Sequence, residues 1–362
     1  MSRFLQAEIN LKNIIHNYST VKAYLNQKKA GCKIIAIVKA DAYGHGAIEI
    51  SKVYESLGVD YLGVAFFEEA LILREAGINS KIIVLFDREI EGIFKYNLIP
   101  VVFDKKQAEA LSKEAYRRGV FLPVHVKVET GMGRLGIYES PCETIKKIAM
   151  LDNIKVEGVM SHLSKTEDVE WTKEQIEKFN QIRECLKVVG ITPIFHIANS
   201  QGLLYEEAIF DAIRPGLMLY GYGSSQLKPS MTVKTRLLDI RSLPEATPIS
   251  YGGTYVTKRK SIIGVIPVGY ADGYFRTLSN KAEVIIKGRK VPVLGTICMD
   301  LTMIDLTEVE NPKINDEVVL LGEMGDTEIS ASHIAQWAGT IPYEVLTSLG
   351  SRARKKYIME EN

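Results

Sequence analysis

Over its first two thirds, the chain alternates between short apolar runs and longer amphipathic stretches. The short runs are rich in β-branched residues and apolar at successive positions, which is typical of strands buried on both faces of a parallel sheet. Glycines 119 and 190 stand where helices should end. The expected strands are Lys33–Val38, Tyr61–Ala65, Lys81–Phe86, Ile99–Phe103, Val124–Val128, Val156–Ser161, Ile194–Ala198 and Ala212–Arg214, and the expected helices are Ala47–Leu57, Glu68–Ala76, Lys105–Arg118, Glu143–Leu151 and Glu170–Val189.

Eight such strand–helix units predict a closed (β/α)8 barrel of the TIM type. An open doubly wound sheet is the alternative, but the glycine fingerprint usual in that fold is missing. After about Lys228 the pattern changes to strands with almost no helix between them, which predicts a second, mainly β domain. We therefore expect a barrel over residues 12–228 and a mainly β domain over 229–362. An N-terminal strand, residues 1–11, is expected to join the β domain. The later strands are expected at Val233–Ser242, Pro248–Thr257, Ile262–Pro267, Ala282–Ile286, Val291–Asp305 and Glu317–Leu321, with a hairpin turn at Lys287–Lys290 and helical segments at Ser332–Trp337 and Tyr343–Ser348.

Composition excludes several classes of protein. A length of 362 residues fits two domains, and 46% hydrophobic with 25% charged residues is an ordinary globular composition. The net charge of +1 gives no field for a nucleic-acid partner. The N-terminus lacks the apolar core of a signal peptide, and no apolar run is long enough to span a bilayer. We expect a cytoplasmic protein without a membrane or nucleic-acid partner.

The four cysteines lie far apart and form no C-x-x-C pair. This spacing suits neither a zinc site nor a disulfide framework. We expect no metal, and reduced thiols at Cys32, Cys142, Cys185 and Cys298.

Chemistry in a (β/α)8 barrel belongs at the carboxyl ends of its strands. Lys39 directly follows the first strand, where partial desolvation would lower its pKa and free a nucleophilic amine for a Schiff base. Ser200 follows the seventh strand and Gly216 the eighth, where barrels commonly bind a phosphate. Each residue alone also suits an exposed rim or an ordinary loop. Together they indicate an aldehyde cofactor that carries a phosphate.

Longer motifs add to these positions. They are Ala7–Leu11, Ala36-Ile37-Val38-Lys39-Ala40-Asp41-Ala42-Tyr43-Gly44-His45-Gly46, Thr130–Gly136, His196–Ser200, Arg214–Gly216, Ser250–Gly252, Gly269–Gly273, Cys298–Asp300 and Tyr343–Val345. In this order they closely resemble motifs of the alanine racemases, along nearly the whole chain. The resemblance implies pyridoxal 5′-phosphate (PLP) as cofactor and interconversion of L- and D-alanine, an isomerase activity that supplies D-alanine for peptidoglycan.

The resemblance also implies a role for each site residue. Lys39 binds PLP covalently and is one of two acid/base groups. Tyr251 is the other and acts from the opposite face, because a proton removed from one face must be returned on the other. Arg214 faces the pyridine nitrogen and, having only donors, leaves it unprotonated, which argues against aminotransferase or decarboxylase chemistry. Lys127 matches a lysine that is carbamylated in many members, its new negative charge positioning Arg134. The remaining implied cofactor contacts are Tyr43, Arg134, His162, Asn199, Ser200, Gly216, Leu217 and Tyr343, and the implied substrate contacts are Arg134, Tyr270 and Met299.

In the family, the residues matched by Tyr251, Tyr270 and Met299 reach the barrel of a partner subunit, which implies a head-to-tail homodimer with composite sites. Without the resemblance, Tyr251 would also suit a cross-strand aromatic position. Glu129 stands where the family usually has aspartate, and Gln201 stands where a small residue is common. These departures leave room for a serine or broad-specificity racemase of the same mechanism. A barrel-type PLP decarboxylase and a non-catalytic PLP carrier are further alternatives.

Overall fold

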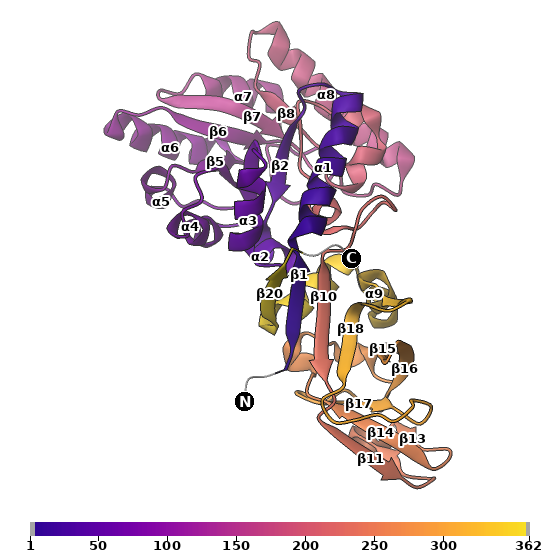
Figure 1. Ribbon diagram of the computed structural model, residues 1–362. Coiled ribbons are helices and arrows are strands. Elements are labelled where there is room, and N and C mark those ends of the chain that lie inside the picture. Colours follow the sequence, from indigo (N-terminus) through magenta and orange to yellow (C-terminus); the bar gives the residue numbers. More distant parts are fainter. Residues whose placement is uncertain (1–3, 360–362) are drawn as a thin grey trace. The chain divides into compact units, whose positions relative to one another are not determined.

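The computed structural model describes residues 4–359 and divides them into two compact units (Figure 1). One unit contains Ile14–Ala40 and Ala47–Lys228. The other combines the N-terminal residues up to Asn13, the segment Asp41–Gly46 and the chain from Pro229 onward. Within residues 4–359, no helix is both long enough and apolar enough to cross a membrane.

Eight parallel strands form the sheet of the first unit. They are β2 (Lys33–Ile37), β3 (Tyr61–Val64), β4 (Ile82–Val84), β5 (Ile99–Val102), β6 (Leu122–Lys127), β7 (Ile154–Met160), β8 (Ile194–His196) and β9 (Ala212–Ile213), in the spatial order β8-β7-β6-β5-β4-β3-β2-β9. The two ends of the sheet meet, because the Asp211 N–H donates to the Phe195 carbonyl and the Arg214 N–H to the Ala198 carbonyl, each over 2.9 Å. The predicted (β/α)8 barrel is confirmed as a nearly closed barrel, and the open doubly wound alternative is wrong.

Helix α1 (Leu11–Lys28) precedes the first barrel strand, and further helices follow most of the barrel strands along the chain. These are α3 (Ala47–Ser56), α4 (Phe67–Glu75), α5 (Glu91–Lys95), α6 (Lys105–Arg118), α7 (Pro141–Ala149) and α8 (Val169–Val188). Local signals set their ends: Asp104 caps α6 by accepting the Gln107 N–H over 2.8 Å, and Gly119 ends it with φ of 65°. Three short 3-10 helices, η1 (Gln201–Leu204), η2 (Glu206–Ala208) and η3 (Leu217–Tyr220), follow β8 and β9. The hydrophobic pattern did not predict α1 or α5.

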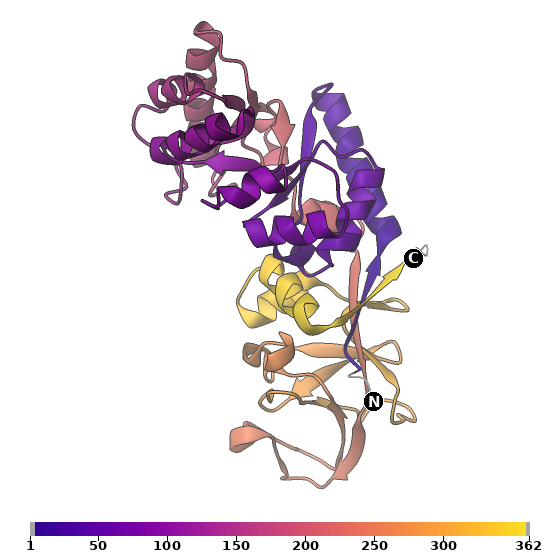
Figure 2. The same ribbon diagram turned by 90° about the vertical axis from the view of Figure 1, so that its left-hand side faces the viewer.

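A ten-stranded sheet forms the second unit. Its strands are β1 (Gln6–Asn10), β10 (Met231–Arg236), β11 (Asp239–Leu243), β14 (Ser261–Ile266), β15 (Glu283–Ile286), β16 (Arg289–Leu294), β17 (Thr302–Asp305), β18 (Glu317–Met324), β19 (Thr327–Ile329) and β20 (Arg354–Ile358). Strand β1 pairs antiparallel with β10 and parallel with β20, so both ends of the chain build this sheet. Two helices, α9 (Ala331–Ala338) and α10 (Pro342–Arg352), complete the unit and lie in the yellow segment beside its strands in Figure 2.

Two long strands expected in this unit are interrupted by loops. The segment 248–257 forms β12 (Pro248–Ile249) and β13 (Tyr255–Val256), separated by the 3-10 turn η4 (Tyr251–Gly253). Positive φ angles at Ser250 (62°) and Gly252 (71°) break the extended backbone there. The segment 291–305 is likewise split after β16, where Gly295 adopts a φ of 72°. Tyr251 therefore lies on a turn, and the cross-strand alternative for it is wrong.

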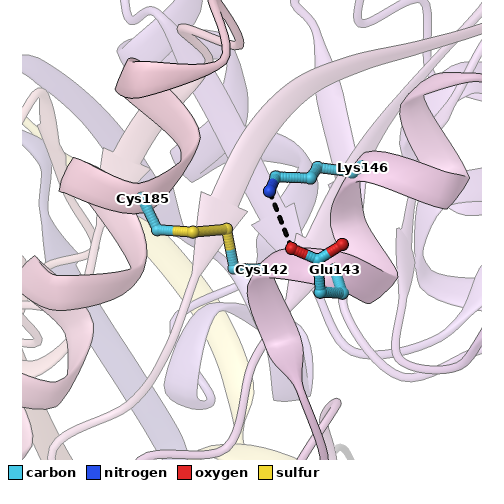
Figure 3. Close-up of a disulfide and its surroundings, with 4 residues drawn as sticks. All are labelled: Cys142, Glu143, Lys146 and Cys185. Atoms are coloured by element: carbon cyan, nitrogen blue, oxygen red, sulfur yellow. Dashed lines mark hydrogen bonds and ion pairs between the residues drawn. A yellow bond between two sulfur atoms is a disulfide. The ribbon is translucent and has the colours of Figure 1, made fainter.

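The expectation of four reduced thiols is also wrong. Cys142, at the start of α7, and Cys185, in the last turn of α8, form a disulfide with a Cα–Cα distance of 6.3 Å (Figure 3). Cys32 and Cys298 are free thiols. The pair is separated by 43 residues, and only the side-by-side packing of consecutive barrel helices brings it together.

Candidate active site

Lys39 lies just beyond strand β2 and begins an unusual turn, α2 (Lys39–Tyr43). The four residues from Ala40 to Tyr43 have φ between 52° and 55°, so this is a left-handed helical turn. Such a conformation costs L-residues about 1–2 kcal/mol each, and the surrounding structure must therefore hold it. The Ala40 N–H contributes to this by donating to a Glu69 carboxylate oxygen over 2.7 Å. The turn fixes the direction in which Lys39 and Tyr43 leave the backbone.

Three cationic side chains surround the ring of Phe86. The Lys39 and Lys127 ammonium nitrogens each lie 5.5 Å from the ring centre, and the Arg134 guanidinium lies 5.4 Å from it. Burial and the positive charge of Arg134 lower the pKa of Lys39. The same two causes lower the pKa of Lys127 to about 8. Both amines therefore lose their proton more easily than an exposed lysine.

Arg134 is carried by a loop that folds around one carboxylate. Glu129 accepts backbone N–H groups from Gly131 over 2.6 Å and from Arg134 over 3.3 Å, and also from Met132. Burial acts to raise the pKa of Glu129, but the backbone hydrogen bonds outweigh it and keep the pKa low. Glutamate at this position, where aspartate is usual in the family resembled, thus still holds the loop as an ionised acceptor.

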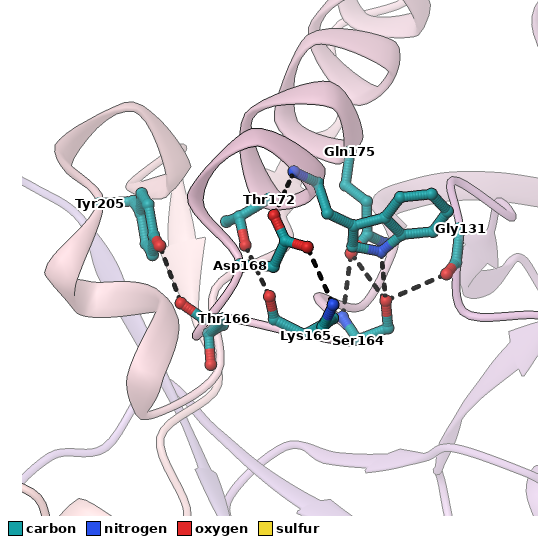
Figure 4. A network of polar contacts seen from close by, with 9 residues as sticks. Gly131, Ser164, Lys165, Thr166, Asp168, Thr172, Gln175 and Tyr205 are labelled. Carbon is teal, nitrogen blue, oxygen red and sulfur yellow. Dashed lines mark hydrogen bonds and ion pairs between the residues drawn. The ribbon is translucent and has the colours of Figure 1, made fainter.

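Gln175 of α8 binds the residues that follow strands β6 and β7 (Figure 4). Its side-chain oxygen accepts the Ser164 N–H over 2.9 Å and the Ser164 hydroxyl over 3.0 Å. Its amide nitrogen donates to the His162 carbonyl over 3.0 Å and to the Thr130 hydroxyl over 3.4 Å. The Gly131 carbonyl also lies 3.0 Å from the Ser164 hydroxyl, so it shares the single Ser164 proton with Gln175. Gln175 is buried with every hydrogen-bonding group used, so it locks the start of the Arg134 loop to the segment that carries His162.

Arg214 is buried beneath this end of the barrel and held by backbone carbonyls. Its guanidinium donates to the carbonyls of His196 over 2.8 Å and Ile197 over 3.2 Å, and to that of Ser161. His162 Nδ1 lies 3.4 Å from the same guanidinium group. Burial lowers the pKa of Arg214 to about 9, which still leaves the side chain protonated at neutral pH. Among residues 4–359, no carboxylate forms an ion pair with Arg214.

Ser200, Gly216 and Leu217 meet at the junction of the last two barrel strands. The buried Ser200 hydroxyl oxygen accepts the Gly216 N–H over 3.0 Å and the Met218 N–H over 3.2 Å. Its own proton is therefore left to donate to a ligand. Leu217 begins η3, so its N–H is one of the donors that a helix start leaves without an internal partner. Asn199 has a structural contact, because its amide oxygen accepts the Gly202 N–H over 2.9 Å.

Tyr43 and Tyr343 come together within the second unit. Their ring centres are 5.8 Å apart with the planes tilted by 47°. Burial raises the pKa of both phenols, so each keeps its proton at neutral pH. Two neutral phenols side by side provide hydrogen-bond donors suited to an anion such as a phosphate.

The other expected residues of this unit gather on neighbouring loops. The Tyr270 N–H donates to the Cys298 carbonyl over 3.1 Å, and the Thr296 hydroxyl donates to the Tyr251 carbonyl over 3.0 Å. The side chains of Tyr251, Tyr270 and Met299 are 71%, 42% and 54% exposed. Large side chains exposed in a cluster are typical of a binding surface.

Gln175, His125 and His196 were given no role from the sequence. His196 lies within a motif quoted above, but nothing in the motif reveals what its ring contacts. His125 and Lys127 are two residues apart on one strand and so share a face, which was an available signal for His125. Gln175 lies in a polar helix, where a glutamine carries no signal.

Comparison with known proteins agrees with the geometry. Residues 9–224 match the family model described as alanine racemase, N-terminal domain, and residues 230–357 match alanine racemase, C-terminal domain. An alanine racemase of Thermodesulfovibrio yellowstonii is 74% identical over 100% of this chain and 99% of its own length.

Solved structures support the same assignment. Alanine racemase of Clostridium difficile 630 has a TM-score of 0.90 at 33% identity, covering 99% of this chain and 96% of its own. The alanine racemase of Bartonella henselae, described with covalently bound pyridoxal phosphate, has a TM-score of 0.88 at 31% identity, covering 99% of this chain and 100% of its own. With both family domains matched in order and relatives similar along the full length, this chain belongs to the alanine racemase family.

Proposed function

We propose that this protein interconverts L- and D-alanine, with PLP bound covalently to Lys39. The observation that carries the proposal is the Lys39 amine: it follows a barrel strand directly, and its pKa is lowered by burial and by Arg134. An amine of this kind is a good nucleophile for an aldehyde. When bound, PLP withdraws electrons from the substrate α-carbon, so that its proton can be removed.

The described residues fit such a cofactor. Ser200, Tyr43 and Tyr343 would offer hydroxyl donors to its phosphate. The backbone at Gly216 and Leu217 would also approach the phosphate, with the Leu217 N–H as the donor, because the Gly216 N–H already donates to Ser200. Arg214 would donate to the ring nitrogen, oriented by His162, with Asn199 shaping the adjacent turn. Because arginine cannot supply that nitrogen with a proton, it limits how far the ring stabilises negative charge, and this disfavours decarboxylation and transamination.

Racemisation needs acid/base groups on both faces of the substrate, and we assign these roles to Lys39 and Tyr251. Lys39 would hold or release a proton at its Nζ, and Tyr251 at its phenolic oxygen. Arg134, Tyr270 and Met299 would bind the substrate carboxylate and line its entrance. The exposure of Tyr251, Tyr270 and Met299 on neighbouring loops supports their insertion into a partner subunit. We accordingly propose a head-to-tail homodimer with composite sites.

Lys127 is proposed to be carbamylated. Unmodified, its buried ammonium stands close to Arg134 and forms no hydrogen bond or ion pair with residues 4–359. A carbamate would convert this repulsion into attraction and hold Arg134 in place. We further propose domains at residues 12–228 and 229–362, a cytoplasmic location, and a role in supplying D-alanine to peptidoglycan. The family assignment supports these proposals.

The test incubates the purified protein with L-alanine or L-serine and resolves the product enantiomers. We expect approach to equal enantiomers, faster with alanine because Tyr343 crowds the space beyond a methyl group. Faster turnover of serine would overturn the proposal that alanine is the substrate. The absence of D-product from either amino acid would overturn the proposed racemase activity.

Two variants test the acid/base assignment. Tyr251→Phe should abolish racemisation while the absorbance of bound cofactor persists. After treatment with borohydride, Lys39→Ala should carry no covalently attached cofactor. Tyr255→Phe, four residues further on in β13, serves as the matched control and should stay active. Activity in Tyr251→Phe would remove Tyr251 from the mechanism.

A further inference from the structure

Three buried side chains form a continuous polar line across the barrel interior. The Arg214 guanidinium lies 2.6 Å from His196 Nδ1, and His196 Nε2 lies 2.8 Å from His125 Nδ1. Arg214 follows β9, His196 ends β8 and His125 lies in β6. Arg214 is 4% exposed, and both histidines are fully buried.

The direction of every hydrogen bond in this line follows from Arg214. Arginine has donors only, so His196 Nδ1 must accept. The proton of a neutral His196 is then on Nε2 and donates to His125 Nδ1. His125 must accept there and carry its own proton on Nε2. Burial lowers the pKa of both rings, so both are neutral at neutral pH and each has a single compatible tautomer.

We propose that His125 is a positioning residue for the reaction: it fixes the tautomer of His196 and thereby the orientation of Arg214. The inference rests on the proposed function, in which Arg214 serves the cofactor ring nitrogen. If the acceptor at His125 is lost, His196 can move its proton to Nδ1, where it would point an N–H at the N–H groups of Arg214. Arg214 would then lose a hydrogen bond and rotate away from its aligned position.

The costs of accommodating His125 distinguish this role from simple core packing. Its Nε2 is buried and forms no hydrogen bond with residues 4–359, whereas a leucine of similar volume would leave no polar group unpaired. The neighbouring strand also yields space, since a Cβ on Gly158 would lie 2.5 Å from His125 Cε1 and Nδ1. Glycine inside a strand weakens the strand. Both costs are explained if the ring is needed for its Nδ1 acceptor.

The first measurement uses the wild-type holoenzyme with ¹⁵N-labelled histidine. Nitrogen chemical shifts distinguish the two tautomers and the imidazolium, and variants at His125 and His196 assign the signals among the six histidines. We expect His196 to be protonated on Nε2 alone, with its proton shifted downfield by the bond to His125. A proton on His196 Nδ1, or a charged His196, would overturn the proposal without any assay of activity.

The second measurement compares His125→Leu with His125→Asn. Leucine removes the acceptor, whereas the asparagine side-chain oxygen can replace the Nδ1 acceptor. For His125→Leu we expect kcat to fall about tenfold or more with little change in KM, a changed cofactor absorbance, and loss of the His196 downfield proton. His125→Asn should recover most of each signal.

Phe195→Leu, a buried change beside His196 in β8, controls for general loss of core packing. Wild-type kcat in His125→Leu, or equal defects in the leucine, asparagine and Phe195→Leu variants, would overturn the proposal. If His125→Leu does not fold, the His196 tautomer measured in the wild type and the kinetics of His125→Asn test the proposal. Failure of the proposed function is separate, because it appears as inactive wild-type protein whatever the tautomer of His196.

Discussion

Gly350 of helix α10 packs backbone to backbone against Gly44, the residue that follows the left-handed turn. A Cβ built on Gly350 would lie 2.7 Å from the Gly44 Cα, and a Cβ on Gly44 would lie 3.0 Å from the Gly350 Cα. Neither neighbour is a side chain that could move aside. This contact holds α10, which carries Tyr343, close to the turn that carries Tyr43.

We therefore expect Gly350→Ala to weaken cofactor binding without removing any residue that touches the cofactor. The new methyl group must push the turn and the helix apart, at a cost of about 1–3 kcal/mol, and so separate Tyr43 from Tyr343. Titration of the apoprotein with PLP measures the effect. Ser351→Ala, on an exposed position of the same helix, is the control. Unchanged PLP affinity in Gly350→Ala would contradict the packing argument.

Burial of Lys127 should make stability depend on pH. Its folded-state pKa is about 8 against an ordinary 10.5, so between these pH values the unfolded chain binds a proton that the folded protein has released. Stability therefore rises with pH across this window, and below it the buried charge costs about 3 kcal/mol. In CO₂-free buffer, Lys127→Met should raise the free energy of unfolding most at pH 7 and least near pH 10.

Denaturant unfolding at several pH values measures this difference, with Lys113→Met on the exposed face of α6 as control. A gain that is the same at pH 7 and pH 10 would mean that the charge is not the cause. Adding ¹³C-bicarbonate to the wild type should give a carbamate signal that is absent from Lys127→Met.

The Cys142–Cys185 disulfide should stabilise the packing of α7 against α8. A loop of this length predicts a loss of about 3–4 kcal/mol when the bond is removed. Reductant should thus lower the unfolding midpoint of the wild type and leave that of a Cys142→Ser/Cys185→Ser variant unchanged, with Cys32→Ser as control. Thiol titration of the unreduced, denatured protein should find the two free thiols, Cys32 and Cys298. Four titratable thiols would show that the bond does not form, as is usual for cytosolic proteins.

Gln175 should affect catalysis although it does not belong to the acid/base pair. Gln175→Leu removes one hydrogen-bond partner each from Ser164, Thr130 and the His162 carbonyl, and we expect about 2–4 kcal/mol of destabilisation with a raised KM for alanine. KM is the sensitive parameter because the Arg134 loop starts at these contacts. Gln181→Leu, on the same helix where the amide binds Glu177, is the control. Equal KM values for the two variants would argue against a role in positioning the loop.

The sequence by itself determined the barrel strands and the family. Runs of apolar β-branched residues must be buried, so the eight barrel strands were found within a few residues, and Lys39, Ser200 and Gly216 were located at strand ends. The motifs identified the family. Local pattern also misled where a loop interrupts a strand, because the positive φ at Ser250 and Gly295 has no signature in hydrophobicity.

The tertiary structure alone decided which distant residues meet. His125 and His196 are 71 residues apart, Cys142 and Cys185 are 43 apart, and Gln175 contacts Thr130 across 45 residues. Periodicity reports which face of an element is buried, but carries no information on which polar group it faces. Closure of the barrel brings the strand ends and neighbouring helices together. The hydrogen bonds from Arg214 through His196 to His125, the disulfide and the contacts of Gln175 all arise in this way.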